Sequence, residues 1–247
     1  MKVYSVTDVG RVRQTNQDYI YASSRQIGNL PNLFVVADGM GGHNGGDFAS
    51  RYAVETLVKT VEADTNFNPI KIIRNAIETA NRKLLKKAGE RKELKGMGTT
   101  VVAATVVGHY AYVANVGDSR LYIAGQKMDQ VTRDHSLVGE MIRMGELSKE
   151  EARTHPDRNI ITRALGTAGD VAIDFFDVKL EKDSRIVLCS DGLYGMVSDE
   201  EMYEVLRECG DGSDPSVALM EKANENGGKD NIAVIVVEPF IEEVREC

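Results

Sequence analysis

Five aspartates stand at the boundaries of apolar, strand-like segments, and their type and spacing suggest chemistry more directly than any other residues do. They are Asp18, Asp38, Asp118, Asp191 and Asp230. For each one alone, a turn or a helix cap is the simpler explanation, because aspartate favours both. That explanation weakens for the set, because Asp-Gly twice ends an otherwise apolar strand, at 38–39 and at 191–192. If these strand ends converge, the carboxylates repel one another unless cations share the site.

The type of donor predicts the type of metal. Clustered carboxylates with water suit a hard cation such as Mg²⁺ or Mn²⁺, whereas zinc and copper prefer histidine and cysteine. The four histidines show no ligand spacing, and the three cysteines include no CxxC pair. Magnesium or manganese is therefore the metal that this donor set favours.

The stretch VVADGMGGH surrounds Asp38 with bare backbone. Gly39 has no side chain, so its own carbonyl can approach a cation that Asp38 also holds. Gly41 and Gly42 either let the backbone pass close to a ligand or form an ordinary flexible turn, and the sequence leaves both explanations open. A nucleophilic aspartate of a phosphatase is normally followed two residues later by a second acid, but that residue is Met40.

Two arginines, Arg11 and Arg13, lie shortly before Asp18 in the sequence. An arginine close to a carboxylate–metal cluster often grips a phosphate group, which its planar fork fits. A surface salt bridge explains the same spacing equally well, and such pairs contribute little to stability. The sequence contains neither the GxxxxGK[ST] of a P-loop nor the GxSxG of a hydrolase nucleophile elbow.

Composition limits the class of protein. The 247 residues are 42% hydrophobic and 28% charged, as is ordinary for a globular protein, and they suffice for one domain with a sizeable core. A net charge of −8 without a basic stripe argues against nucleic acid as a partner. The sequence shows no signal peptide and no apolar run near the roughly 20 residues that span a bilayer. Three cysteines favour reduced thiols, so we expect a cytoplasmic protein without a membrane partner.

Hydrophobic periodicity predicts blocks of strands and helices in a single domain. Strand-like segments occupy 2–9, 19–23, 32–37, 98–107, 110–116, 120–124, 171–178, 185–189 and 231–238. Helices are predicted over 44–61, from Asn68-Pro69 to a stop at Gly89, from the capping boxes Ser148–Glu151 and Ser198–Glu201, and from Asp214-Pro215. Strand 120–124 is expected to continue the meander of 98–116, so antiparallel pairing is favoured. The polar region 134–167 is predicted to be a surface excursion.

Taken together, these features resemble the metal-dependent serine/threonine protein phosphatases of type 2C, the PPM family, in their compact bacterial form. The similarity is carried end to end by R-x-x-x-x-D (Arg13 to Asp18), VADGMGGH (36–43), GMGTT (96–100), GDSR (117–120), TRDHS (132–136), HPDRNIITRALG (155–166), CSDGL (189–193) and GKDNI (228–232). The resemblance implies an α+β fold, an αββα sandwich of two central, mostly antiparallel β-sheets flanked by helix pairs. It also implies that residues 1–247 form one catalytic domain.

The resemblance further implies a set of metal ligands. Asp38 would bridge two Mn²⁺ or Mg²⁺ ions, with the Gly39 carbonyl on one of them. Asp191 and Asp230 would hold the other ion. Asp118, together with Asp191, matches the ligands of a possible third ion in bacterial members.

Two catalytic roles and a flap are implied as well. Asp18 would act through water at the metals, and Arg13 would bind the substrate phosphate. The excursion over 145–166 matches a flap beside the active site that influences the choice of substrate. Its candidate residues are Gly145, Arg158 and Arg163.

Two positions depart from the family pattern. Gln17 stands where many members have glutamate, which removes one charge near the metals. Met40 stands where eukaryotic members have a histidine proposed as general acid. Bacterial members commonly have methionine there, so the group that protonates the leaving oxygen is not assigned. His43 lies nearby in the sequence and is expected to be structural.

The implied function is hydrolysis of phosphoserine and phosphothreonine on proteins by a metal-activated water. The expected protein is a monomer whose partners are phosphorylated proteins made by a serine/threonine kinase. Two alternatives belong to other classes: a phosphatase-like binding module without catalysis, and a different two-metal hydrolase such as a nuclease. The first typically loses metal ligands, yet the implied ligands Asp38, Gly39, Asp118, Asp191 and Asp230 are all present. The acidic charge balance argues against the second.

Overall fold

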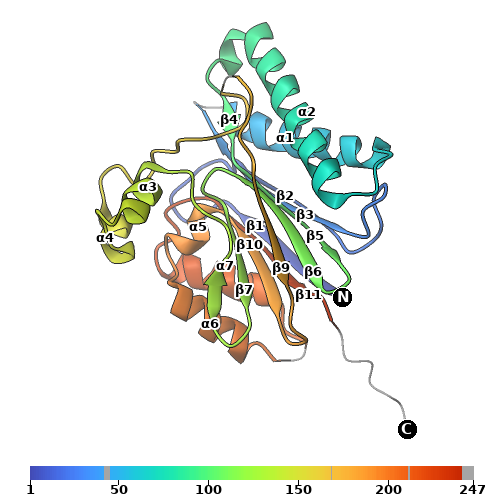
Figure 1. Ribbon diagram of the computed structural model, residues 1–247. Coiled ribbons are helices and arrows are strands. Elements are labelled where there is room, and N and C mark those ends of the chain that lie inside the picture. The colour runs from blue at the N-terminus through green and yellow to red at the C-terminus, as the bar shows by residue number, and fades with distance from the viewer. Residues whose placement is uncertain (42–44, 168, 211, 241–247) are drawn as a thin grey trace.

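Two β-sheets lie face to face at the centre of the fold (Figure 1). The computed structural model describes residues 1–41, 45–167, 169–210 and 212–240. The terminal sheet, which contains both terminal strands, has the order β1 (Lys2–Asp8), β11 (Ile232–Glu238), β10 (Arg185–Cys189), β7 (Arg120–Ala124) and β8 (Met128–Gln130). The second sheet has the order β2 (Asp18–Ser23), β3 (Leu33–Met40), β5 (Val101–Val107), β6 (Tyr110–Val116) and β9 (Asp174–Lys179), and β4 (Gly98–Thr99) pairs with β3. Every pairing recorded between these strands is antiparallel.

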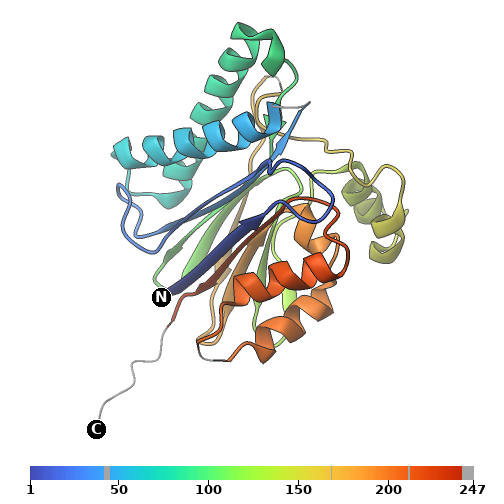
Figure 2. The ribbon, with the colours of Figure 1, turned by 180° about the vertical axis from the view of Figure 1, so that it is seen from behind.

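Helices cover the two outer faces of this sandwich. The second sheet is covered by α1 (Gly45–Ala63) and α2 (Pro69–Glu90), followed by a short 3₁₀ helix, η1 (Lys92–Leu94). The terminal sheet is covered by α5 (Asp191–Tyr194), α6 (Asp199–Glu208) and α7 (Pro215–Glu225). Seen from behind, α1 and α7 lie on opposite sides of the strands (Figure 2). Two further helices, α3 (Leu137–Met144) and α4 (Lys149–Thr154), project to one side (Figure 1). The predicted αββα sandwich is therefore confirmed.

Side chains that alternate along strand β3 contribute to two different hydrophobic cores, one on each face of the sheet. Leu33, Val35 and Ala37 are buried against the helices of the α1–α2 layer. Phe34 and Val36 point the other way and are buried in the core between the two sheets. Successive side chains of a strand face opposite sides, so a strand that is buried on both faces is apolar throughout.

Strand β11 divides its side chains in the same way. Ala233, Ile235 and Val237 are buried in the core between the sheets. Ile232 and Val234 are buried in the core beneath helices α5, α6 and α7. The fold thus has three apolar layers, and its central strands are held on both faces.

The predicted helix starts are confirmed by their caps. Asn68 accepts a hydrogen bond from the backbone of Lys71 at the start of α2. Ser148 and Ser198 each form a complete capping box, at α4 and α6. Asp214 caps α7 with its side chain. These bonds satisfy backbone N–H groups that have no partner within the helix.

Strand β3 is longer than predicted, because it continues past Asp38 through Gly39 to Met40. The reason is the short strand β4, whose two residues pair with Gly39 and Met40 and supply backbone partners. Two residues are too few to show a pattern in the sequence. Asp38 is therefore held inside a strand rather than at its end.

The expectation that strand 120–124 continues the meander was wrong. This segment, β7, leaves the second sheet and pairs with β10 and β8 of the terminal sheet. Gly117, with a φ of 110°, lies in the connection where the chain changes sheet. Two smaller differences also appear: α2 runs through Gly89 to Glu90, and β9 begins only at Asp174.

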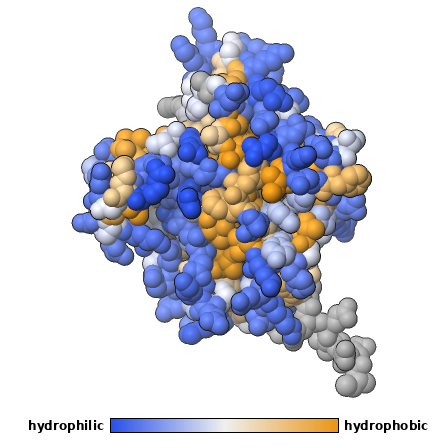
Figure 3. Space-filling model, viewed as in Figure 1, coloured by the Kyte–Doolittle hydropathy of each residue, from blue (hydrophilic) through white to orange (hydrophobic). Residues whose placement is uncertain are grey.

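The strands and the outer helices differ in the polarity of the surface that they expose. Apolar side chains gather in the middle of the face shown in Figure 3, over the strands, while the outer helices are mainly hydrophilic. None of the helices in the described part of the chain is both long enough and apolar enough to cross a membrane.

The layering predicts where truncation destabilises the protein. Leu57 of α1 is 0% exposed, whereas Phe67, before α2, is 86% exposed. We expect Leu57→Ala to lower the free energy of unfolding by about 2–5 kcal/mol, because it opens a cavity in the α1–α2 layer. Phe67→Ala, the control, should change it by less than about 0.5 kcal/mol. Urea unfolding followed by circular dichroism measures both, and equal losses would contradict this layering.

Candidate metal centre

The five predicted aspartates, here called the acidic centre, come together at one end of the sandwich. Antiparallel register places Asp18 of β2 directly opposite Asp38 of β3. Asp191 begins α5 after β10, and Asp230 lies two residues before the neighbouring strand β11. Asp118 lies in the connection between β6 and β7. The charges of the other four all act on Asp38, so both sheets contribute to one cluster.

Burial raises the pKa of four of these carboxyl groups, and neighbouring negative charges add to the effect. The pKa of Asp118 rises to about 8 and that of Asp191 to about 6, in each case chiefly because burial disfavours the charged form. The pKa values of Asp18 and Asp38 also lie well above the ordinary value, first through burial and then through the neighbouring aspartates. Such a cluster is unfavourable unless positive charge is brought to it.

The donor set fits a hard divalent cation. Asp18 Oδ1 and Asp191 Oδ1 are buried and have no hydrogen-bond donor among the described residues. A buried carboxylate oxygen without a donor is costly, and a cation supplies the missing partner. Within the described ranges, no three acidic, histidine or cysteine side chains already enclose a single point as metal ligands. The carboxylates therefore offer the ligands in one place without fixing the position of an ion.

Gly39 lies where no side chain fits. A Cβ atom there would come within 2.1 Å of the Gly46 carbonyl oxygen and 2.7 Å of the Gln17 carbonyl oxygen. The Gly39 N–H donates to that same Gln17 carbonyl, at 3.1 Å. The absence of a side chain is thus required by close backbone packing beside Asp38. Gly42 and His43, at the end of this motif, lie outside the described residues.

Arg13 contacts the acidic centre directly. Its Nη2 atom lies 2.7 Å from Asp230 Oδ2, with the two side chains 53% and 34% exposed. The hydrogen bond and the charge of Asp230 raise the pKa of the guanidinium group further. Arg13 therefore forms a salt bridge with one of the five aspartates, and its binding of a substrate phosphate stays a prediction. The guanidinium group stands at the solvent-facing rim of the cluster.

The three predicted flap residues lie in different surroundings. Gly145 ends α3 in a left-handed conformation, with a φ of 77°, which glycine adopts without strain. Arg158 is exposed on the segment after α4. Arg163 reaches back to the body of the protein, where Nη1 lies 3.0 Å from Asp174 Oδ1 and 3.2 Å from His135 Nε2.

His135 links this flap contact to the acidic centre. Its Nδ1 accepts a hydrogen bond from the Gly117 N–H at 3.0 Å, next to Asp118, and its Nε2 lies 3.1 Å from Asp174 Oδ2. The motif TRDHS contained this histidine, but its partner Asp174 lies 39 residues away in the sequence and left no local sign. Of the three predicted flap residues, Arg163 is thus the one that contacts His135, which in turn binds the backbone next to Asp118.

Two supporting residues were not predicted as functional. Ser190 donates from Oγ to Asp18 Oδ2 at 2.6 Å and so joins the two sheets at the acidic centre. Asn231 binds the backbone of residues 9–17 through its side chain. Both stand next to a predicted aspartate within its motif, and adjacency to those aspartates was the available signal.

A partly buried arginine provides positive charge near the carboxylates. Arg120 forms a bidentate ion pair with Asp134, with Nη2 2.7 Å from Oδ2 and Nε 3.0 Å from Oδ1. Its guanidinium carbon lies 3.6 Å from the centre of the Tyr194 ring. Its charge partly offsets the rise in the pKa of Asp118 and Asp191.

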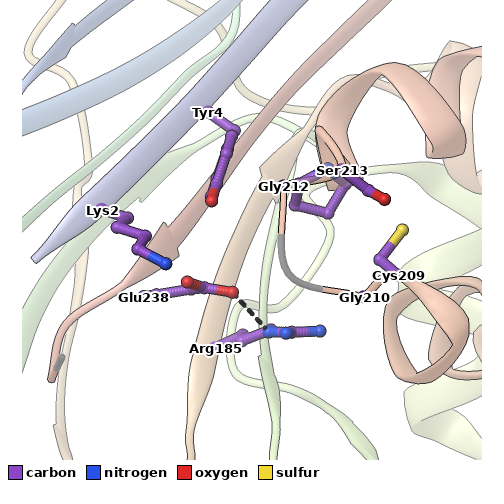
Figure 4. A pocket seen from close by; sticks show the side chains of 9 residues that line it. Lys2, Tyr4, Arg185, Cys209, Gly210, Gly212, Ser213 and Glu238 are labelled. Carbon is purple, nitrogen blue, oxygen red and sulfur yellow. Dashed lines mark ion pairs between the residues drawn. The ribbon is translucent and has the colours of Figure 1, made fainter. Parts of the chain in front are cut away.

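A surface pocket lies at the opposite end of the same strands (Figure 4). Its lining residues are Lys2, Tyr4, Arg185, Cys209, Gly210, Gly212, Ser213, Pro215 and Glu238. Arg185 Nε and Glu238 Oε1 form an ion pair of 2.9 Å within it. Arg185 begins β10 and Glu238 ends β11, whereas the other ends of these strands lead to Asp191 and Asp230. This pocket is therefore separate from the acidic centre.

Comparison with known proteins agrees with the fold and the motifs. A family model described as protein phosphatase 2C matches residues 10–225. The serine/threonine phosphatase stp of Listeria monocytogenes is 42% identical over 239 residues, which cover 94% of this chain and 93% of the relative. The serine/threonine phosphatase Stp1 of Staphylococcus aureus has a TM-score of 0.90 at 37% identity, covering 98% of this chain and 95% of that one.

A further solved structure bears on the metal. The catalytic domain of the serine/threonine protein phosphatase PstP, in complex with two manganese ions, has a TM-score of 0.82 at 29% identity. The match covers 95% of this chain and 96% of that chain. The chain studied here belongs to the protein phosphatase 2C family, as the resemblance of its motifs indicated.

The raised pKa values predict how stability depends on pH without metal. Asp191 and Asp118 have ordinary values of 3.8 and folded values of about 6 and about 8. The folded state therefore holds protons that the unfolded state has released, and rising pH through this window costs stability. We expect the melting temperature in excess chelator to fall between pH 4.5 and pH 8, which calorimetry measures.

Two variants distinguish repulsion within the acidic centre from the effect of the net charge of the protein. Asp118→Asn should raise the metal-free melting temperature at pH 8 by at least ~2 °C, since about 1 kcal/mol shifts a protein of this size by that much. Asp177→Asn, on an exposed position of β9, should not. A metal-free stability that rises between pH 4.5 and pH 8, or an unchanged Asp118→Asn protein, would contradict the repulsion described here.

Proposed function

We propose that this protein removes phosphate from phosphoserine and phosphothreonine side chains of proteins, at the acidic centre. It is a serine/threonine protein phosphatase by membership of the 2C family, whose relatives carry that name. One observation supports the assignment of the site: aspartates from both sheets converge, and two of their buried oxygens lack a donor among the described residues. We further propose that residues 1–247 form one catalytic domain with a flap over 145–166.

Manganese or magnesium is the proposed cofactor. Asp38, the Gly39 carbonyl, Asp191 and Asp230 would hold two ions, and Asp118 together with Asp191 offers ligands for a third. When bound, such ions lower the pKa of water, so that hydroxide is available near neutral pH to attack the phosphorus. The all-oxygen donor set favours these cations over zinc.

The chain holds Asp38 in place through its backbone. Thr100 binds it twice, since its Oγ1 accepts from the Asp38 N–H and its N–H donates to the Asp38 carbonyl, both at 2.9 Å. Thr99 Oγ1 donates to the same carbonyl at 2.8 Å. Both faces of strand β3 are also buried. A ligand position held this firmly does not have to be reorganised during the reaction.

Asp18 and Arg13 are proposed to act on water and phosphate, respectively. Asp18 is held by Ser190 on one oxygen, which leaves its other oxygen for water or a cation. Arg13 stands half-exposed at the rim, where its planar fork can bind two phosphate oxygens. In this structure the guanidinium group instead forms an ion pair with Asp230. Binding of a cation by Asp230 would free Arg13 for the substrate.

Protonation of the leaving oxygen is assigned to solvent. Met40 carries no titratable group, and its side chain lies against Gly98. His135, the buried histidine nearest to Asp118 in the hydrogen-bond network, is engaged on both ring nitrogens. Neither residue is placed to deliver a proton to a departing alkoxide.

The partners follow from the chemistry and the charge. We propose phosphorylated proteins, made by a serine/threonine kinase, as substrates. The net charge of −8 argues against nucleic acid as substrate or partner. We expect a cytoplasmic monomer without a membrane partner.

Replacing a metal ligand tests the proposal. We expect Asp38→Asn and Asp191→Asn each to lower kcat/KM for a phosphoserine peptide by at least about 100-fold, because each variant loses a charged cation ligand. Asp177→Asn is the control. Phosphate release from phosphoserine, phosphothreonine and phosphotyrosine peptides, with and without Mn²⁺, gives the measurement. Unchanged turnover in folded variants, or cleavage of nucleic acid without phosphopeptide hydrolysis, would refute the assignment.

The flap proposal has its own test. Arg163→Ala removes the contacts to Asp174 and His135, so the flap should hold a protein substrate less well. We expect kcat/KM for a phosphoprotein to fall by roughly 10-fold while p-nitrophenyl phosphate is hydrolysed at nearly the wild-type rate. Arg82→Ala, on the outer surface of α2, is the control. Equal losses for both substrates would show that Arg163 supports the metal centre instead.

A further inference from the structure

Asn231 directly follows Asp230, and its side chain forms hydrogen bonds with one other segment, residues 9–17. The side chain is 5% exposed. Its Nδ2 donates to the Val9 carbonyl at 3.0 Å and to the Thr15 carbonyl at 2.9 Å. Its Oδ1 accepts from the Gln17 N–H at 2.8 Å. A buried side-chain amide that is satisfied on both its nitrogen and its oxygen has one well-defined orientation.

The segment that Asn231 binds is the one that carries Arg13. Residues 9–17 connect β1 to β2, and Asn231 holds this loop near its start, at Val9, and near its end, at Thr15 and Gln17. The half-exposed Arg13 side chain lies between these points and reaches Asp230. The side-chain amide of Asn231 thus binds the loop on both sides of Arg13 in the sequence.

Backbone packing independently ties the same two segments together. Gly10 has a φ of 78°, and a Cβ atom there would lie 2.3 Å from the Asp230 carbonyl oxygen. The Arg11 N–H donates to the Gly228 carbonyl at 2.7 Å. The loop of Arg13 therefore lies against the chain around Asp230 with no space between them.

We propose that Asn231 is a positioning residue, which fixes the distance between the phosphate-binding guanidinium of Arg13 and the carboxylates of the acidic centre. The inference rests on the phosphate-binding role proposed for Arg13. Arg13 has a long, half-exposed side chain, so its own contacts alone do not hold it. Misplacement of a substrate-binding group by about 1 Å can cost on the order of 100-fold in rate. Asn231 fixes the loop that carries that side chain from within the protein.

A purely structural role is the competing explanation, and the chain offers a matched control for it. Asn32 is also buried, at 4% exposure, and its side chain makes three hydrogen bonds, with Val106 N and O and with Thr105 Oγ1. It lies before β3, at the end of that strand away from Asp38. Asn32→Ala should therefore cost stability as Asn231→Ala does, without touching the loop of Arg13.

The experiment is a double-mutant cycle of Asn231→Ala with Arg13→Ala in the manganese-loaded protein. We expect Asn231→Ala to lower kcat/KM for a phosphoserine peptide by about 100-fold and to raise the inhibition constant of inorganic phosphate about 10-fold. In the Arg13→Ala background, the same change should lower kcat/KM by no more than about 3-fold, because the arginine it positions is gone. Mn²⁺ affinity of Asn231→Ala by calorimetry should stay within about 3-fold of wild type, as should kcat/KM of Asn32→Ala.

Equal losses from Asn231→Ala in both backgrounds, or a similar loss of kcat/KM in Asn32→Ala, would overturn the inference and leave the proposed function standing. An Arg13→Ala protein with wild-type kcat/KM and phosphate inhibition would overturn the phosphate role itself, and the inference with it. If Asn231→Ala does not fold, the isosteric Asn231→Asp is used in the same cycle. That variant keeps the acceptor for the Gln17 N–H and loses both donations, and the same outcomes decide.

Discussion

Repulsion among five carboxylates at one end of an apolar sandwich is the constraint on which the rest of this structure depends. Burial and mutual charge raise the pKa of Asp118 to about 8, so the folded protein keeps these groups ionised only with difficulty. Folded proteins are stable by only about 5–15 kcal/mol, so an unfavourable cluster of this kind needs a strong frame. Three apolar layers provide that frame, because the central strands are buried on both faces and cannot move apart to relieve the repulsion.

Within that frame, Asp38 is held through its backbone and Asp18 through its side chain. Thr100 fixes Asp38 from both sides, and Ser190 joins Asp18 to the other sheet. Gly192 leaves no room for a side chain, since a Cβ atom would lie 1.9 Å from the Asn231 carbonyl oxygen. Such contacts keep the carboxylates together in one cluster, which is unfavourable for the protein alone and suitable for binding cations.

Local spacing predicted the apolar strands, the helix caps and the five aspartates, whereas the layered sandwich was expected from the family resemblance. Local spacing could not predict what depends on long-range pairing. Asp18 faces Asp38 only because β2 and β3 are in that register, and β7 crosses to the terminal sheet where an uninterrupted meander was expected. Asn231 and Ser190 were missed for a related reason. Asparagine and serine are common at turns, and their partners lie more than 170 residues away in the sequence.

The proposed flap over 145–166 is held by contacts beside the aspartates of the acidic centre. Arg153 of α4 donates from Nη2 to the carbonyls of Tyr194 and Val197, at 2.7 and 3.0 Å, just after Asp191. At the far end of the flap, Arg163 binds the Asp174–His135 pair behind Asp118. The segment 145–166, which we propose to be a flap, is thus attached near Asp191 at one end and near Asp118 at the other. Because these attachments are side-chain bonds, the other residues of the proposed flap would be able to differ in sequence without disturbing the acidic centre, which would allow the choice of substrate to change.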